Sequence, residues 1–228
     1  ILFAATAVHA ARRGRRYVLE LGSAAIYGIL LELGDIAIFK SYQYNEQFAW
    51  NIGWVPIQIG LAWALIIYGA MRFSDQLGLP ARAAPFADAL WAILLDLAFD
   101  AVAIRMGLWS WNIPLDAGYF GVPAGNFYAW LFVALMFSLV TRWMRGEFSP
   151  SPVAAVATGE GARGWGWQWL APLIAYPMML MAQLPFFFAV RLFYPPGRGA
   201  GLEIFVATAI IFAALVLRDV KRIRPESP

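Results

Sequence analysis

LLDLAFDAVAIRMGLWSWNIPLDAGYFGVPAGNFYAW, residues 94–130, is the segment from which the fold is inferred. It sets Asp96 and Asp100 inside an apolar run, four positions apart and therefore on one face of a helix. A carboxylate at bilayer depth costs roughly 2.5–3.5 kcal/mol on insertion scales, so it is retained where it faces protein, water or substrate. We therefore predict a membrane helix with an acid pair, followed by an ordered loop of Gly, Pro and Trp that ends near Asn126.

The composition of the whole chain supports a membrane protein. Its 228 residues are 61% hydrophobic and 14% charged, with a mean hydropathy of +0.63. These values are typical of an all-α, polytopic membrane helix bundle, and we expect one integral membrane domain over residues 1–228. The net charge of +3 comes from basic residues at the ends of apolar segments, which favours a topogenic role over nucleic-acid binding.

Apolar segments of spanning or near-spanning length predict about seven transmembrane helices. They cover residues 1–10, 17–39, 54–72, 87–106, 126–144, 167–190 and 203–217. We expect the first to be the truncated remainder of a longer span. Proline residues within 167–190 predict kinks, and a kinked aromatic helix would open a lateral path for a long lipid-soluble ligand. Plain helix packing explains these residues equally well.

The positions of Lys and Arg predict the orientation of these spans. If the first span runs inward, 13 of the 17 basic residues fall on the cytoplasmic side: Arg12, Arg13, Arg15, Arg16, Arg72, Arg82, Arg142, Arg145, Arg163, Arg218, Lys221, Arg222 and Arg224. The sequence therefore predicts an integral protein of a bacterial inner membrane with a cytoplasmic C-terminus. The loop 107–125 then lies at the outer end.

Residue counts limit the chemistry available to the chain. It has no cysteine, so a disulfide framework and a thiolate metal site are excluded, and the single histidine, His9, excludes a histidine-based metal site. Carboxylate ligation of a hard cation remains open, although we expect neither a metal nor a cofactor. The connection 145–166 lacks the Gly-x-x-x-x-Gly-Lys pattern of a phosphate-binding loop. Neither Lys40 nor Lys221 lies inside the last predicted span, which excludes a retinal protein.

Two further acids lie in the segment 17–39. Glu32 has no basic residue near it in its own helix, so it pairs with Arg105 or Lys40, or it stays protonated. Glu20 lies one turn from Arg16, which predicts an interfacial ion pair.

Small and aromatic residues flank these acids. Gly22 and Gly28 are predicted to allow close helix packing. An interfacial aromatic belt accounts for most of the aromatic residues between 40 and 54, namely Tyr42, Tyr44, Phe48, Trp50 and Trp54.

The order of these motifs resembles the carotenoid biosynthesis membrane-protein family, which includes the carotenoid 1,2-hydratases. The matching residues are Asp96, Asp100, Gly107, Trp109, Trp111, Tyr119, Phe120, Gly121, Val122, Pro123, Asn126, Phe127 and Trp130, with earlier blocks at 32–34, at Tyr42 and Tyr44, and at 55–63. The resemblance covers roughly residues 28–145. One departure is Ala101, because family members often carry proline after the second aspartate.

The resemblance implies that water is added across the terminal 1,2 double bond of an acyclic carotenoid. Protonation at carbon 2 would form a tertiary cation at carbon 1, which water captures. The candidate catalytic residues are Asp96, Asp100 and Glu32, one as a buried proton donor and another as the base. The candidate substrate-binding residues are Trp109, Trp111, Tyr119, Asn126, Trp130 and Trp63. Aromatic ring faces stabilise a desolvated cation by about 2 kcal/mol.

Other functions fit the same residues. A non-catalytic carotenoid-binding or pigment-binding subunit of a larger pigment–protein complex is the first, and Ala101 favours it. A proton-coupled transporter is the second, since transporters also use intramembrane carboxylates. In the third, the acids pair with Arg105 or with each other only to fix helix packing. The expected partners are a carotenoid and membrane lipid, and not nucleic acid.

Overall fold

Helices form over all of the predicted apolar segments. The computed structural model describes residues 1–113, 115, 117–148, 168–193 and 201–223. Within these ranges the α-helices are α1 (Leu2–Arg13), α2 (Arg15–Gly34), α3 (Ile57–Gln76), α4 (Ala84–Arg105), α5 (Ala124–Met144), α8 (Ala171–Phe193) and α9 (Leu202–Ile223). A short π-helix, η1 (Asp35–Phe39), continues α2, and a 3₁₀ turn, η3 (Gln168–Leu170), precedes α8. Most of the connection 145–166 lies outside the described residues.

Among the described residues, four helices are long and apolar enough to cross a membrane: α2 with η1, α3, α5 and α8. Helix α4 has the required length but contains Asp88, Asp96, Asp100 and Arg105. Helix α1 has 12 residues, fewer than the ~20 that one crossing requires. The four apolar helices are consistent with a membrane protein, whereas the count of seven spans stays a prediction.

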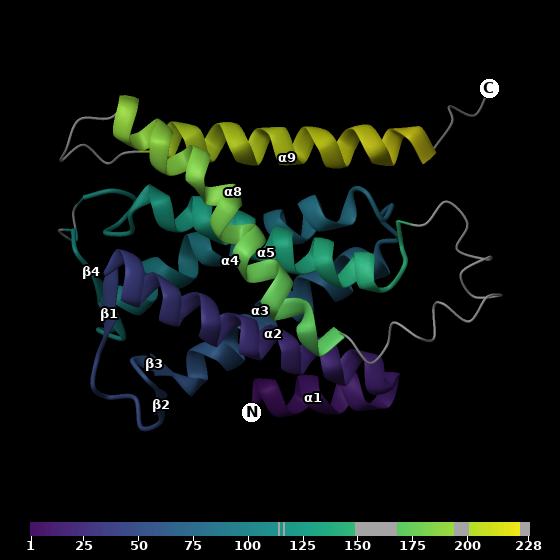
Figure 1. Ribbon diagram of the computed structural model, residues 1–228, viewed down its shortest axis with the longest axis horizontal. Helices are drawn as coiled ribbons and strands as arrows, with labels where there is room; N and C mark the ends of the chain where they lie inside the picture. Colours follow the sequence, from purple (N-terminus) through teal and green to yellow (C-terminus); the bar gives the residue numbers. More distant parts are fainter. Residues whose placement is uncertain (114, 116, 149–167, 194–200, 224–228) are drawn as a thin grey trace.

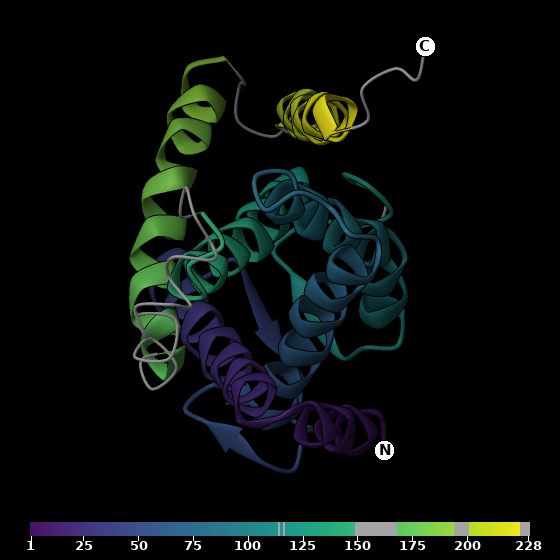
Figure 2. The same cartoon turned by 90° about the vertical axis from the view of Figure 1, so that its right-hand side faces the viewer.

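The helices form a bundle in which chain neighbours pack together. Figure 2 looks along the bundle: α2, α3, α4 and α5 follow one another, and α8 packs against both α2 and α5. Helix α9 lies on α4 and α5, while α1 lies beside α2 and α3. Short connections favour such antiparallel neighbours. Helix α8 crosses the bundle obliquely (Figure 1), so it closes the side between α2 and α5.

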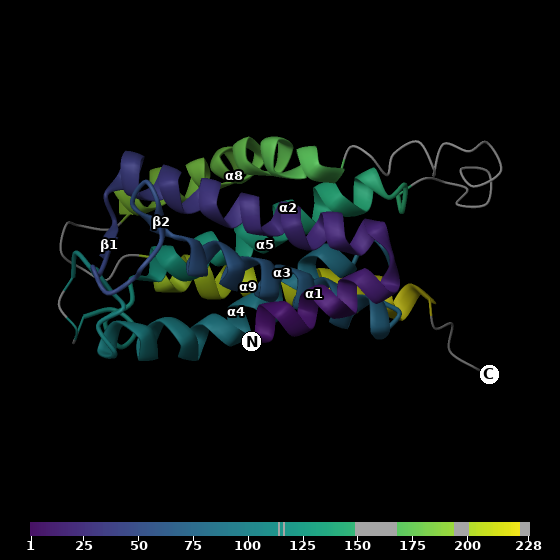
Figure 3. The ribbon, with the colours of Figure 1, turned by 90° about the horizontal axis from the view of Figure 1, so that it is seen from below.

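Short strands gather at one end of the bundle, which we call the aromatic end. There β1 (Tyr42–Tyr44) pairs antiparallel with β4 (Trp109–Trp111), and β2 (Asn51–Ile52) pairs with β3 (Val55–Pro56). Figures 1 and 3 show that α9 runs away from this end, so β4 and the C-terminal end of α9 lie at opposite ends of the bundle. The predicted topology requires this separation. The membrane face that each end meets remains a prediction.

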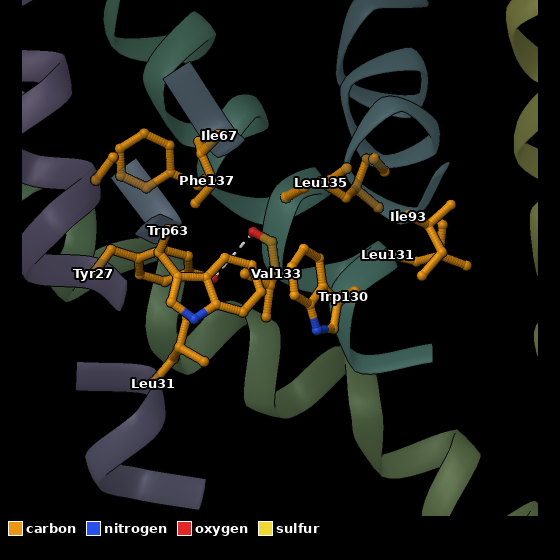
Figure 4. Close-up of a cluster of buried hydrophobic side chains, with 14 of the residues drawn as sticks. Tyr27, Leu31, Trp63, Ile67, Ile93, Trp130, Leu131, Val133, Leu135 and Phe137 are labelled. Atoms are coloured by element: carbon orange, nitrogen blue, oxygen red, sulfur yellow. Dashed lines mark hydrogen bonds between the residues drawn. The ribbon is translucent and has the colours of Figure 1, made fainter. Parts of the chain in front are cut away.

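The core between the helices is aromatic near the middle of the bundle. Trp63 of α3 and Trp130 of α5 pack with ring centroids 4.2 Å apart (Figure 4). The Tyr27 hydroxyl of α2 donates a hydrogen bond of 3.2 Å to the backbone oxygen of Val133. These contacts join α2, α3 and α5 around a layer that also borders the cavity described below.

The two glycines of α2 differ in their surroundings. A Cβ on Gly28 would lie 2.5 Å from Trp63 Cβ, so the absence of a side chain allows α3 to approach. The packing prediction is therefore confirmed for Gly28. It is wrong for Gly22, where nothing lies within 4 Å of an added Cβ, because this residue faces the exposed side of the helix.

Buried ion pairs hold the other end of the bundle, which we call the arginine end. Glu20 is 1% exposed and accepts hydrogen bonds from Arg145 at 2.5 and 2.8 Å and from Arg72 at 3.2 Å. Arg16 lies 4.0 Å from Glu20, so the predicted pair exists. The interfacial location is wrong, because Glu20 is buried under Arg72 near the end of α3 and Arg145 after α5. Arg142 continues the network to Asp75, Asp88 and Glu147.

Candidate active site

Two carboxyls and one amide meet inside the bundle. Asn126 Nδ2 donates to Asp96 Oδ2 at 2.9 Å and to Asp100 Oδ2 at 2.6 Å. Asp96 is fully buried and Asp100 is 3% exposed. The spacing of four residues on α4 puts both acids on the face toward α5, as the sequence predicts. One side-chain amide therefore holds two carboxyls together in a low-dielectric interior.

The start of α5 positions this amide. Pro123 is the N-cap of α5 in an extended conformation, so Asn126 falls in the first turn of the helix. The preceding turn, closed by backbone hydrogen bonds between Tyr119 and Val122, requires glycine. Gly118 has a φ of 61°, and a Cβ there would lie 2.5 Å from the Val122 carbonyl oxygen. This turn directs α5 back toward α4.

Glu32 of α2 is held by three donors. The Tyr42 and Tyr44 hydroxyls donate to Oε2, and Trp63 Nε1 donates to Oε1 at 2.6 Å. The predicted partners of Glu32, Arg105 and Lys40, are therefore wrong. They were proposed as basic residues on the same predicted side of the membrane, but the bundle brings residues of β1 and α3 to this carboxylate.

Arg105 does not pair with the acids of its own helix. Its guanidinium donates to the backbone oxygens of Ala101 at 2.9 Å and Phe120 at 2.7 Å. An ion pair between Arg105 and Asp96 or Asp100, considered as a purely structural explanation, is therefore not present. Arg105 instead fixes the loop after β4.

The carboxyls Glu32 and Asp100 border one cavity of about 330 Å³. Its walls come from α2, η1, β1, α3, α4, β4, α5 and α8, and they are mostly apolar and aromatic. Polar lining residues are Glu32, Asp35, Ser41, Tyr42, Tyr44, Asp100, Asn112, Asn126, Tyr128, Tyr176 and Gln183. An apolar pocket with a few convergent polar groups is typical of a small-molecule site.

Asp96 and Asp100 differ in their access to this cavity. Asp100 lines it, together with Asn126, whereas Asp96 lies behind them and does not border it. The Oδ1 atom of Asp96 is buried and has no hydrogen-bond partner among the described residues. A ligand in the cavity would touch Asp100 directly, and Asp96 would act through Asp100 and Asn126.

Most of the aromatic residues expected to bind substrate line the cavity. These are Trp63, Trp109, Trp111 and Trp130. Strand pairing sets Trp109 opposite Tyr44 and Trp111 opposite Tyr42. Tyr119 does not border the cavity. Its ring packs against Phe120 and Phe127, so the turn before α5 carries it away from the acids, and we do not retain it as a substrate-binding residue.

Tyr42 and Tyr44 are functional candidates that the belt interpretation missed. Burial, followed by the charge of Glu32, raises the pKa of both hydroxyls well above the usual value near 10. They therefore remain protonated hydrogen-bond donors at neutral pH. The Tyr-x-Tyr spacing was a usable signal, because alternate residues of a strand face the same side.

Among the described residues no three Asp, Glu or His side chains gather in a way that could hold a metal ion. The donors available in the cavity are carboxyl, hydroxyl and amide groups. They can hold and move protons and orient a water molecule.

Comparison with protein families resolves which class of protein has this site. The family described as carotenoid biosynthesis protein matches residues 1–190. The chain belongs to this family. Comparison with curated proteins and with solved structures gave no match. The matched range includes all of the acids and aromatic residues that line the cavity, so a carotenoid is a plausible ligand for it.

Proposed function

We propose that this carotenoid biosynthesis protein is a hydratase that adds water across the terminal 1,2 double bond of an acyclic carotenoid. The observation that carries the proposal is the pair of buried carboxyls on one amide nitrogen beside an aromatic cavity. Adding water leaves the overall oxidation level unchanged, so the reaction needs no redox cofactor. The setting is a bacterial inner membrane, with the aromatic end outside and the C-terminus cytoplasmic.

Asp100 is the proton donor in this proposal. Two carboxyls this close hold one shared proton in preference to two negative charges. Asp100 faces the cavity and carries the shared proton, and the charge left after its transfer stays on Asp100, where the Asn126 amide donates to it. The π electrons of the terminal double bond accept the proton at carbon 2, which leaves a tertiary cation at carbon 1. A second carboxyl accepts a proton from the attacking water, a role for which the sequence argument offered Asp96 or Glu32.

Aromatic rings protect the cation until water reaches it. Trp63, Trp109, Trp111 and Trp130 border the cavity, and a ring face stabilises a desolvated cation by about 2 kcal/mol. Water elsewhere in the cavity would be excluded by the same apolar walls. Asn126 holds the acid pair and also faces the cavity, so it orients the reacting end group or the water.

The substrate enters from the side of the bundle. Phe39 of η1 and Phe187 of α8 stack with ring centroids 4.9 Å apart and line the cavity while 38% and 40% exposed. Pro185 lies inside α8 two residues before Phe187, and its missing N–H weakens the helix there. A cavity of about 330 Å³ takes the end group of a long polyene, and the remainder stays in the lipid.

Conversion of an acyclic carotene by cells that express the chain tests the proposal. Wild type should give a product heavier by one water. Asp100→Asn keeps the size of the side chain but removes the carboxyl proton, so hydration should fall by ~100–10,000-fold, the effect of losing one acid–base group. Asp75→Asn at the arginine end is the matched control and should keep the activity. Carotene retained by each purified protein shows that the cavity is intact.

Hydration by Asp100→Asn at the wild-type rate would refute the acid-pair mechanism. Carotene retained by wild type without any hydration would refute the enzyme and favour a pigment-binding subunit. Ala101, next to Asp100, is the sequence feature that agrees with that second function.

A further inference from the structure

A third carboxyl, Asp35, faces the cavity besides Glu32 and Asp100. It begins η1 and lines the cavity one turn after Glu32. Lys40 then adopts a left-handed conformation with a φ of 50°, and its amide donates to the Asp35 backbone oxygen at 3.1 Å. The reversed chain brings the Ser41 side chain into a hydrogen bond with Asp35. Single π-turns and left-handed non-glycine residues are uncommon and cluster at functional sites.

The three cavity carboxyls differ in how many donors already occupy them. Glu32 accepts three hydrogen bonds, and Asp100 accepts one from Asn126 next to Asp96. Within the part of the chain that the structure describes, Ser41 is the one side-chain hydrogen-bond partner of Asp35. A carboxylate offers about four acceptor positions. Glu32 acts on Asp35 and Asp100 alike, but Asp100 is also paired with Asp96. Asp35 is therefore the cavity carboxyl with the most acceptor positions left for water.

We propose that Asp35 is the base that accepts a proton from the attacking water. This inference deepens the proposed function and rests on it. A lone pair of the water oxygen forms the bond to carbon 1, one O–H bond of that water breaks, and its proton passes to the Asp35 carboxylate. Asp100 has then lost one proton and Asp35 has gained one. Exchange with solvent restores both groups, so water is the only molecule consumed.

The surroundings of Asp35 suit a bound water. Tyr176 of α8 lines the cavity with its hydroxyl packed against Gly34, and the charge of Asp35 acts on it. Ser41 belongs to the chain segment that reverses after Lys40 and returns to Asp35. A buried water requires two to four polar partners, and these three side chains supply them. The charge of Glu32 acts on both Asp35 and Asp100, and all three carboxyls line the same cavity.

Reaction in D₂O separates a proton donor from a base. Without the base, the cation forms and then loses a proton or deuteron from carbon 2, which returns labelled starting carotene. We expect Asp35→Asn to lower hydration by ~100–10,000-fold, while deuterium uptake at carbon 2 of the recovered carotene continues within a few-fold of wild type. Asp100→Asn should abolish both. Asp75→Asn should change neither.

The outcomes distinguish this inference from the function on which it rests. Hydration by Asp35→Asn at the wild-type rate overturns the inference, and so does loss of hydration and deuterium uptake together while carotene is still retained. If wild type neither hydrates nor labels the carotene, the proposed function itself fails. Ser41→Ala keeps the carboxylate and loses its hydrogen bond. It should lower hydration less than Asp35→Asn with labelling unchanged, which tests the role should Asp35→Asn not fold.

Discussion

Replacing Gly28 by alanine tests whether the close crossing of α2 and α3 holds Trp63 in place to donate to Glu32. The added Cβ would lie 2.5 Å from Trp63 Cβ and 2.9 Å from Trp63 Cγ. Carbon atoms pack at about 3.5–4.0 Å, so α2 and α3 must separate by roughly 1 Å. Trp63 Nε1 lies 2.6 Å from Glu32 Oε1, and such a shift would stretch that bond to the limit for a hydrogen bond. Trp130, 4.2 Å away between ring centroids, restricts the retreat of Trp63.

The expected cost follows from these contacts. Overpacking costs about 1–3 kcal/mol, a weakened hydrogen bond to a charged group up to about 1.5–3 kcal/mol, and alanine returns about 0.5–1 kcal/mol through its helix propensity. We therefore expect Gly28→Ala to lower the free energy of unfolding by about 2–4 kcal/mol, against no loss for Gly22→Ala on the open side of the same helix.

Equilibrium unfolding of both variants in mixed detergent micelles, followed by far-ultraviolet circular dichroism, measures this difference. Gly22→Ala carries the same gain in helix propensity without the steric contact, so the comparison isolates the contact with Trp63. Equal unfolding free energies for the two variants would refute the close α2–α3 crossing and the support that it gives to Glu32.

Two further predictions concern the arginine end and the lateral entrance. Glu20→Gln should lower the free energy of unfolding by about 3 kcal/mol, because it leaves Arg72 and Arg145 buried without their shared carboxylate. Glu147 is 29% exposed, so Glu147→Gln should lower it by only about 0–1 kcal/mol. Equal losses in the same unfolding assay would contradict the burial of this network. Phe39→Cys with Phe187→Cys, oxidised to a cross-link in this cysteine-free chain, should stop carotene uptake until a reductant is added. The control, Phe73→Cys with Trp91→Cys, replaces rings that are also 4.9 Å apart and should leave carotene uptake unchanged. Carotene uptake that continues while the cross-link between positions 39 and 187 is verified to be intact would rule out this entrance.

The sequence by itself determined the helices and the common face of Asp96 and Asp100. Long apolar segments form helices because a chain in lipid satisfies its backbone hydrogen bonds locally. The spacing of Asp96 and Asp100 fixes their common face for the same local reason, since four residues advance a helix by about one turn. The family resemblance rested on residues of this segment, and the family match agrees with it.

Only the tertiary structure decided which groups surround each acid. Glu32 receives donors from β1 and from α3, and Trp63 is 31 residues away in the chain. Neither helical periodicity nor local charge spacing reports which helices become neighbours, and so Arg105 and Lys40 were wrong partners. Tyr42 and Tyr44 read as membrane-interface residues until the pairing of β1 with β4 turned them into the cavity. The physical reason is that a carboxylate inside a bundle takes its donors from whichever elements the packing brings within about 3 Å.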